Sequence, residues 1–79
     1  MIIHVWIELM KYHTAPAAAL KALEASARHL SFTRAAGELN VTQSAISHQI
    51  KHLEELWDAK LFERRKKGLE LTPAGRALA

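Results

Sequence analysis

Two amphipathic segments separated by a very short gap restrict the fold of this chain more than any other feature. The first segment carries apolar residues at helical steps of three and four, namely Phe32, Ala35, Ala36 and Leu39. Its alanines let a second helix approach closely at a steep angle, as a helix-turn-helix requires. Either Ser31 or Thr33 can cap this helix. Asn40 and Val41 then form a tight turn, in which we expect Val41 to fill the corner.

The second segment is a helix from Thr42, whose side chain can cap it, to about Trp57. At about 100° per residue, its polar side chains fall within an arc of roughly 140°. They are Gln43, Ser44, Ser47, His48 and Lys51. The opposite side is apolar and consists of Ala45, Ile46, Ile50, Leu53, Leu56 and Trp57. Gln49 falls inside the apolar arc, so we expect its amide to be hydrogen-bonded between helices.

An earlier helix is predicted from about Pro16 to His29, because proline is tolerated in a first turn and the run is rich in alanine. Thr14 or Ala15 would lie near its cap. One buried stripe is expected along this helix, made by Leu20, Leu23, Ala27 and Leu30.

After Lys60 the pattern changes from helical steps to alternation, which predicts a β-hairpin. Leu61 and Phe62 begin the first strand, and Gly68 permits the turn. The tip is basic and consists of Arg64, Arg65, Lys66 and Lys67. Thr72 and Pro73 then start a further helix. The fold class is therefore mainly α with a small β-hairpin, a winged helix-turn-helix with a three-helix core.

Residues 1–14 differ from the rest and leave three interpretations open. Alternating apolar residues suggest a strand, whereas Ile3, Ile7 and Met10 equally fit a helical stripe. The third interpretation is an extension upstream of a natural start at Met10. We predict that the winged helix-turn-helix domain spans residues 15–72 and that another helix starts within residues 73–79. The apolar stretch at the N-terminus is shorter than the roughly 20 residues that span a membrane. It also lacks the features of a signal peptide, so we expect a cytoplasmic protein.

Composition narrows the function classes. With 79 residues the chain suits one small domain, and its formal net charge of +3 favours an anionic partner. No cysteine is present, which excludes disulfides and cysteine-based zinc sites. His48 and His52 lack an evident third metal ligand, and no nucleophile–base pair or phosphate-binding glycine loop is recognisable. We therefore expect neither an enzyme nor a metal or cofactor site.

The polar face of the 42–57 helix matches what a DNA major groove needs, because the groove admits one helix and offers hydrogen-bonding base edges. Gln43 can pair bidentately with adenine, and His48 can donate to guanine or phosphate. Ser44 and Ser47 are short enough for close approach. Lys51 is expected to meet the DNA backbone. The sequence therefore predicts sequence-specific binding of double-stranded DNA.

The basic tip adds an electrostatic component. Its cations, Arg64, Arg65, Lys66 and Lys67, can reach phosphates or enter a minor groove. If they neutralise about three phosphates, they contribute about −3 to the slope of the logarithm of the binding constant against the logarithm of the salt concentration. Two alternatives remain open: a winged-helix module that binds a partner protein with the help of Trp6 and Ile7, and a truncated, non-functional regulator fragment.

From about Ala17 to Ala79 the chain resembles the N-terminal domain of LysR-type transcriptional regulators. The segments ARHLSFTRAAGELNVTQSAISHQIKHLEE and KLFERRKKGLELTPAG carry the resemblance. His48 stands where most of the family has arginine, and in this respect the chain is similar to the branch of glycine-cleavage activators and β-lactamase regulators. The resemblance implies a bacterial repressor or activator that is a homodimer in its full-length context.

On matching positions, the resemblance implies DNA contacts from both parts of the domain. The recognition helix, which is the predicted 42–57 helix, supplies Thr42, Gln43, Ser44, Ser47 and His48. The wing, which is the predicted β-hairpin, supplies Arg64, Arg65 and Lys67. Thr33 and Arg34 match a segment that often touches backbone phosphate.

The chain departs from the family pattern in three places. Gly37 stands where a longer polar residue is usual, at a cost of about 1 kcal/mol in helix propensity. Trp57 and Asp58 replace the usual Leu-Gly after the recognition helix, and aspartate suits a left-handed cap less well than glycine. The family dimerises through a long linker helix, of which only the first turn is present here, and the effector domain is missing. We therefore expect weak, monomeric binding unless residues 1–14 supply an interface.

Overall fold

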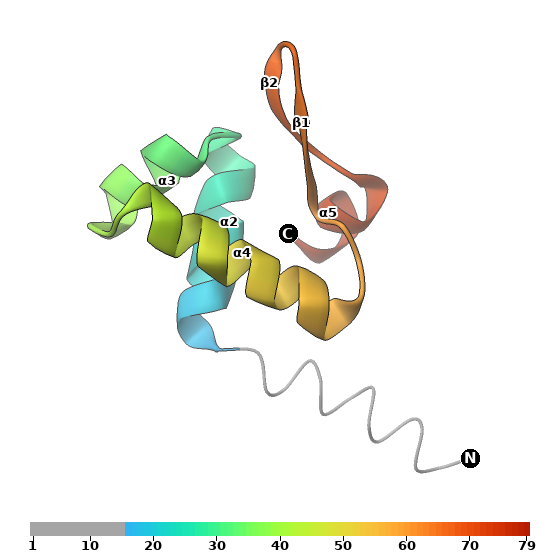
Figure 1. Cartoon of the computed structure of the whole chain (residues 1–79), viewed down its shortest axis with the longest axis horizontal. Coiled ribbons are helices and arrows are strands. Elements are labelled where there is room, and N and C mark those ends of the chain that lie inside the picture. Colours follow the sequence, from blue (N-terminus) through green and yellow to red (C-terminus); the bar gives the residue numbers. More distant parts are fainter. Residues whose placement is uncertain (1–15) are drawn as a thin grey trace.

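The computed structural model describes residues 16–79. The three interpretations of residues 1–14, and the partner-binding role of Trp6 and Ile7, therefore lie outside the described residues. The elements in chain order are α2 (Ala17–His29), α3 (Phe32–Leu39), α4 (Gln43–Trp57), β1 (Phe62–Arg65), β2 (Gly68–Leu71) and α5 (Pro73–Leu78). Figure 1 shows α4 crossing α2, with α3 beside them and the hairpin projecting from the helices. The predicted fold class is confirmed.

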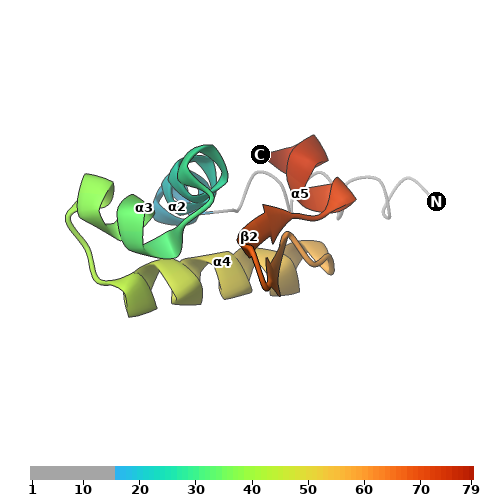
Figure 2. The same ribbon diagram turned by 90° about the horizontal axis from the view of Figure 1, so that it is seen from above.

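The helices are arranged in two layers. Figure 2 shows α2 and α3 together on one side and α4 beneath them. The buried residues that hold the layers together are Ala19, Ala22, Leu23, Ala25, Ala35, Ala36, Ile46, Ile50, Leu53, Leu61 and Phe62. The predicted apolar sides of α3 and α4 are confirmed, since Ala35 and Ala36 meet Ile46 and Ile50 in one core cluster.

The caps of the helix-turn-helix agree with the sequence. Of the two candidates for α3, Ser31 is the cap, and its hydroxyl accepts from the Arg34 N–H at 3.1 Å. Thr42 caps α4 by accepting from the Ala45 N–H at 3.1 Å. The residues predicted near the cap of α2, Thr14 and Ala15, lie outside the described residues; the N-cap position itself is Pro16, which makes no side-chain cap hydrogen bond. The chain reaches α2 through a proline, whose fixed φ suits a helix start without a hydroxyl cap.

The buried stripe predicted for α2 is confirmed at Leu23 and at Ala27, which packs against the core, but is wrong at Leu20 and Leu30. The buried residues are Ala19, Ala22, Leu23, Ala25 and Ser26, whereas Leu20 is 42% exposed and Leu30 is 46% exposed. Alanines occur on every side of this helix, so more than one of its sides is small enough to pack closely against α3 and α4. Leu30 lies outside the helix, in a left-handed cap with φ of 48°, which turns its side chain from the core.

The turn between α3 and α4 also differs from expectation. Val41 is 46% exposed and does not fill the corner. The backbone closes the turn instead, because Asn40 is left-handed and the Val41 N–H donates to the Ala36 carbonyl at 3.0 Å. Gln49 is half-buried beside a hollow of about 270 Å³ and has no hydrogen-bond partner within residues 16–79. The bridge between helices predicted for Gln49 is therefore absent from this part of the chain.

The end of α4 and the wing turn depend on two unusual backbone conformations. Asp58 adopts the left-handed cap with φ of 49°, and its N–H donates to the Glu54 and Glu55 carbonyls. The departure at Asp58 thus does not prevent the turn that glycine usually makes. Gly68 has φ of 125°, as the predicted hairpin turn requires. The strands pair antiparallel, with Phe62 opposite Leu71 and Arg65 opposite Gly68.

Gly37 provides a direct test of the α3 environment. A Cβ built there meets no atom within 4 Å, so alanine fits without rearrangement. We expect Gly37→Ala to stabilise the domain by about 1 kcal/mol, because alanine removes the propensity cost of glycine inside a helix. Thermal unfolding followed by circular dichroism should show a Tm higher by about 4–8 °C.

The control for this test is Gly75→Ala, in which the same side chain enters a filled space. A Cβ at Gly75 would lie 2.1 Å from the Leu61 carbonyl oxygen. This variant should lower the Tm. Similar shifts from both variants would contradict the packing described for these glycines.

Candidate nucleic-acid interface

The outward face of α4 contains the polar residues predicted from the sequence. Thr42, Gln43, Ser44, His48 and Lys51 are exposed, and Ser47 is half-buried. The opposite side is held in the core by Ile46, Ile50 and Leu53, which are at most 3% exposed. The burial pattern therefore fixes the rotation of α4 about its axis. It leaves one continuous polar face with short side chains near the N-terminus of the helix.

Farther along α4, two residues that the sequence analysis did not select join this face. His52 and Glu55 line a shallow hollow of about 160 Å³ together with His48 and Lys51. Glu55 brings a carboxylate close to these cationic and titratable groups. Helical spacing from His48 and Lys51 could have identified both residues. The C-terminal part of the face is consequently less positive than Lys51 alone suggests.

Thr33 lies at the N-terminal end of the same surface. Its hydroxyl donates to the Gln43 side-chain oxygen Oε1 at 3.0 Å, which links α3 to the first residue of α4. Both side chains are exposed. The structure therefore brings together a residue expected to touch phosphate and a residue expected to contact a base.

The wing places its four cations in different environments. Arg65 forms ion pairs with Glu63 at 2.9 Å and with Glu70 at 2.6 Å. The hydrogen bond that Arg65 donates to Glu63, together with both carboxylate charges, raises the pKa of Arg65. Lys66 and Lys67 form the turn and make no ion pair within the described residues. Arg65 is thus neutralised locally, unlike the two lysines beside it.

Arg64 is directed toward α3 instead of toward an acidic partner. Its guanidinium lies 5.4 Å from the centre of the Phe32 ring, within the range of a cation–π contact. Phe32 in turn packs edge-on against Phe62, with ring centres 5.4 Å apart and an interplanar angle of 76°. Since Phe32 precedes Thr33, these contacts connect the wing, α3 and the start of α4 in one stretch of surface.

The base of the wing is held by residues to which the sequence analysis assigned no functional role. A Glu54 carboxylate oxygen accepts from the Leu61 N–H at 2.8 Å, just before β1. On the other side, the Thr72 N–H donates to the Leu61 carbonyl at 3.0 Å, and the Thr72 hydroxyl donates to the Lys60 carbonyl. We call Glu54, Leu61, Thr72 and Gly75 the wing clasp. It fixes where the wing leaves α4, and no local sequence pattern encodes it, because its residues are up to 21 positions apart in the chain.

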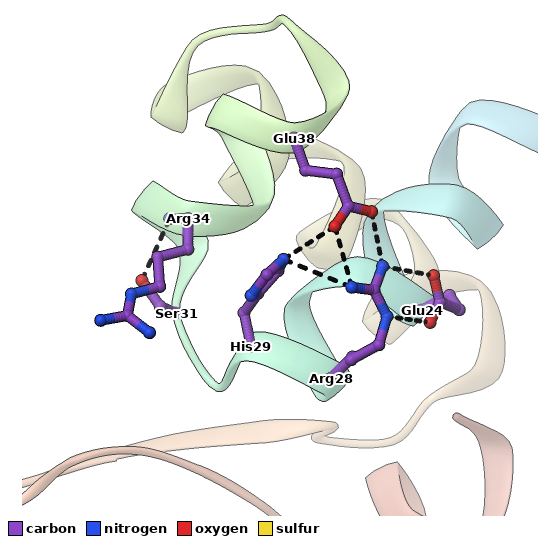
Figure 3. Close-up of polar contacts among 6 residues, drawn as sticks. All are labelled: Glu24, Arg28, His29, Ser31, Arg34 and Glu38. Atoms are coloured by element: carbon purple, nitrogen blue, oxygen red, sulfur yellow. Dashed lines mark hydrogen bonds and ion pairs between the residues drawn. The ribbon is translucent and has the colours of Figure 1, made fainter.

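A charged cluster joins the end of α2 to α3. Arg28 binds Glu24 at 2.8 Å and also binds Glu38, which is shared with His29 at 2.8 Å (Figure 3). Hydrogen bonds from Arg28 first, and then from His29, lower the pKa of Glu38 to about 2. The Glu38 carboxylate is therefore ionised at neutral pH. The cluster anchors α3 to the C-terminal end of α2.

Arg34 points away from this cluster in Figure 3. It forms no ion pair within residues 16–79, and its side chain is exposed. The same part of the chain contains no group of three metal-ligating residues. None of its helices has the length and apolar character needed to cross a membrane.

Comparison with protein-family models gives one match over most of the chain. The model described as "Bacterial regulatory helix-turn-helix protein, lysR family" matches residues 17–76. This range includes the polar face of α4, the wing and the wing clasp.

Curated relatives agree with this match. The HTH-type transcriptional activator AmpR of Pseudomonas aeruginosa is 62% identical over 63 residues, which are 80% of this chain and 21% of the relative. The glycine cleavage system transcriptional activator of Escherichia coli K12 is 58% identical over 62 residues, covering 78% and 20%. This chain spans about one fifth of the length of these relatives. The resemblance to the branch of glycine-cleavage activators is confirmed.

Solved structures share the fold. A LysR-family regulator from Eggerthella lenta has a TM-score of 0.76 and 41% identity, with 80% of this chain and 90% of that chain covered. The BenM DNA-binding domain in complex with catB site 1 DNA has a TM-score of 0.71 and 36% identity, covering 75% and 66%. DarR of Vibrio fischeri in complex with DNA has a TM-score of 0.73 and 37% identity, covering 78% and 21%.

Proposed function

Because this chain belongs to the lysR family of bacterial regulatory helix-turn-helix proteins, we propose that it binds double-stranded DNA sequence-specifically to regulate transcription. The observation that carries the proposal is the fixed rotation of α4, which directs short polar side chains outward. A helix of this kind can enter a major groove, where base edges offer distinguishable donors and acceptors. Two solved relatives of the same fold, BenM and DarR, are complexes with DNA.

Within this proposal, the residues of the polar face have different roles. Gln43, Ser47 and His48 read base edges, while Ser44 contacts a base or a phosphate. Thr42 lies at the N-terminus of α4, where the helix dipole and unpaired N–H groups favour a phosphate. Lys51 meets the backbone farther along the groove.

Outside α4, the proposed contacts are electrostatic. Arg34 has no competing ion pair among the described residues and is available to a phosphate. Lys66 and Lys67 bind phosphates or enter a minor groove, because they form the exposed turn of the hairpin. Arg64, which is exposed and lies beside Phe32, adds a contact of the same kind. Arg65 contributes less, since Glu63 and Glu70 already neutralise it.

The proposed assembly is a homodimer in a longer protein. One domain offers one recognition helix, whereas two linked domains gain affinity through effective concentration. We therefore propose that a single domain binds DNA weakly.

Base reading is tested by the double variant Gln43→Ala/Ser47→Ala. We expect it to lose preference at the base pairs these residues contact, by roughly tenfold to hundredfold per bidentate contact. Selection from a random duplex library, followed by binding measurements on selected and scrambled duplexes, would reveal this loss. Gln49→Ala is the matched control, because Gln49 lies on the same helix but away from the polar face.

Two results would count against the proposal in different ways. Equal losses on selected and scrambled duplexes would show that Gln43 and Ser47 do not read bases. Failure of the unmodified chain to bind any duplex at low ionic strength would contradict DNA binding itself and would favour a role in protein interaction.

A further inference from the structure

We propose that Thr33 is a positioning residue for base recognition, which holds the Gln43 amide in place beside α3 before DNA arrives. The inference rests on the proposed function. Its basis is the hydrogen bond in which the Thr33 hydroxyl donates to Gln43 Oε1 at 3.0 Å. Thr33 thereby acts through Gln43 and does not itself contact DNA.

The hydroxyl proton of Thr33 can serve only one acceptor at a time. A threonine hydroxyl has a single O–H donor, and phosphate oxygens can only accept from it. While Thr33 donates to Gln43, it cannot donate to the DNA backbone. The positioning role therefore competes with the phosphate contact that the family resemblance implies for Thr33. The neighbouring Arg34 is free of ion pairs within residues 16–79 and can supply a phosphate contact in its place.

The bond leaves Gln43 able to recognise a base. Its Oε1 keeps a second lone pair, and its NH₂ group keeps both donors. The amide can therefore still accept from adenine N6 and donate to adenine N7. A free glutamine can turn its amide by 180° and present the reverse order of donor and acceptor. Thr33 restrains the position of the amide in either order, because its hydroxyl can donate to Oε1, as here, or accept from the NH₂ group of the turned amide.

Thr33 is attached to a well-anchored element, which makes it an effective support. Ser31 caps the start of α3, and Arg28 binds Glu38 near its end. Phe32 packs against Phe62 of the wing. Gln43 itself is exposed at the first position of α4, where the core does not restrain its side chain. Prior immobilisation of such a side chain reduces the entropy lost on binding.

The test compares Thr33→Val, which keeps the shape but removes the hydroxyl, with Thr33→Ser, which keeps the hydroxyl. Each is made with and without Gln43→Ala in the 79-residue chain. The position read by Gln43 is the one at which Gln43→Ala loses preference. Thr33→Val should lower discrimination there by about tenfold while leaving other positions and the salt slope unchanged. Thr33→Ser should retain the discrimination, and Thr33→Val should add nothing to Gln43→Ala.

A second measurement needs no DNA and so separates this inference from the proposed function. Nuclear magnetic resonance relaxation of the Gln43 side-chain NH₂ should show greater mobility in Thr33→Val and unchanged mobility in Thr33→Ser. Unchanged mobility in Thr33→Val would overturn the positioning role. Uniform weakening of all duplexes, persisting in the Gln43→Ala background, would overturn it as well and assign Thr33 to the phosphate backbone. If the unmodified chain binds no duplex, the DNA-binding proposal fails and takes the inference about base recognition with it.

Discussion

Replacing Leu53 with alanine should lower the thermal stability of the domain more than any other single change considered. Leu53 is 0% exposed and lies in the core cluster between the α4 helix and its neighbours. Truncating a buried leucine costs about 2–5 kcal/mol, through lost burial and the cavity left behind. A domain of this size has a total stability of only about 4–12 kcal/mol. Circular dichroism should therefore show a Tm lower by at least about 10 °C, or no folded baseline.

Leu20→Ala is the matched control, because it removes the same atoms from a side chain that is 42% exposed. Its effect should be about 1 kcal/mol, since a large part of the truncated surface already faces water and little cavity is left behind. This pair also separates the observed core from the stripe predicted for α2, in which Leu20 was a buried member. A larger loss for Leu20→Ala than for Leu53→Ala would mean that the core is assigned to the wrong residues.

The helix-turn-helix and the wing could be predicted from sequence because their signals are local. In α4, Ile46, Ile50 and Leu53 repeat at the spacing of one helix face, so the polar residues between them must point outward. Gly68 and the alternation after it determine the hairpin in the same way. Each of these features depends on residues a few positions apart in the chain.

The α2 face and the α3–α4 corner could not be predicted, because competing choices there are nearly equal by sequence alone. The small residues Ala19, Ala22 and Ala25 are buried, while the larger Leu20 is exposed. The spacing of leucines alone therefore does not identify the buried side of α2. At Val41, backbone hydrogen bonding closes the turn and leaves the side chain exposed. Packing between separate elements decided both cases.

Contacts between distant residues explain the remaining differences at the candidate site. The bond from Thr33 to Gln43 and the contact of Glu54 with Leu61 each join two elements whose relative position no local pattern encodes. Both contacts restrain groups that the proposed function requires to be in place before DNA binds. The clasp sets the exit of the wing from α4, and the Thr33 bond sets the amide of Gln43. Preorganisation of this kind reduces the cost of binding.

Removing Lys66 and Lys67 of the wing, which form no ion pair within residues 16–79, should produce the largest change in DNA affinity. Each phosphate contact contributes about −0.9 to the slope of log K against log salt. Lys66→Gln/Lys67→Gln should therefore make the slope shallower by about 2. If the variant and the unmodified chain bind equally at 1 M salt, the variant should bind roughly 60-fold more weakly at 0.1 M salt. The loss should be the same for selected and scrambled duplexes, because phosphates carry no base sequence. Titrations at several salt concentrations measure both quantities.

Two further double variants test whether the effect comes from the wing itself or from net charge. Lys21→Gln/Arg76→Gln removes the same charge from α2 and α5, outside the proposed interface, and should change the slope little. Glu63→Gln/Glu70→Gln removes both carboxylates that neutralise Arg65, so it should tighten binding and steepen the slope by up to about 1. If the wing lysines and the remote pair shift the slope equally, net charge alone drives binding. In that case the hairpin has no specific place on the duplex, and the conformation fixed by the wing clasp serves folding instead of recognition.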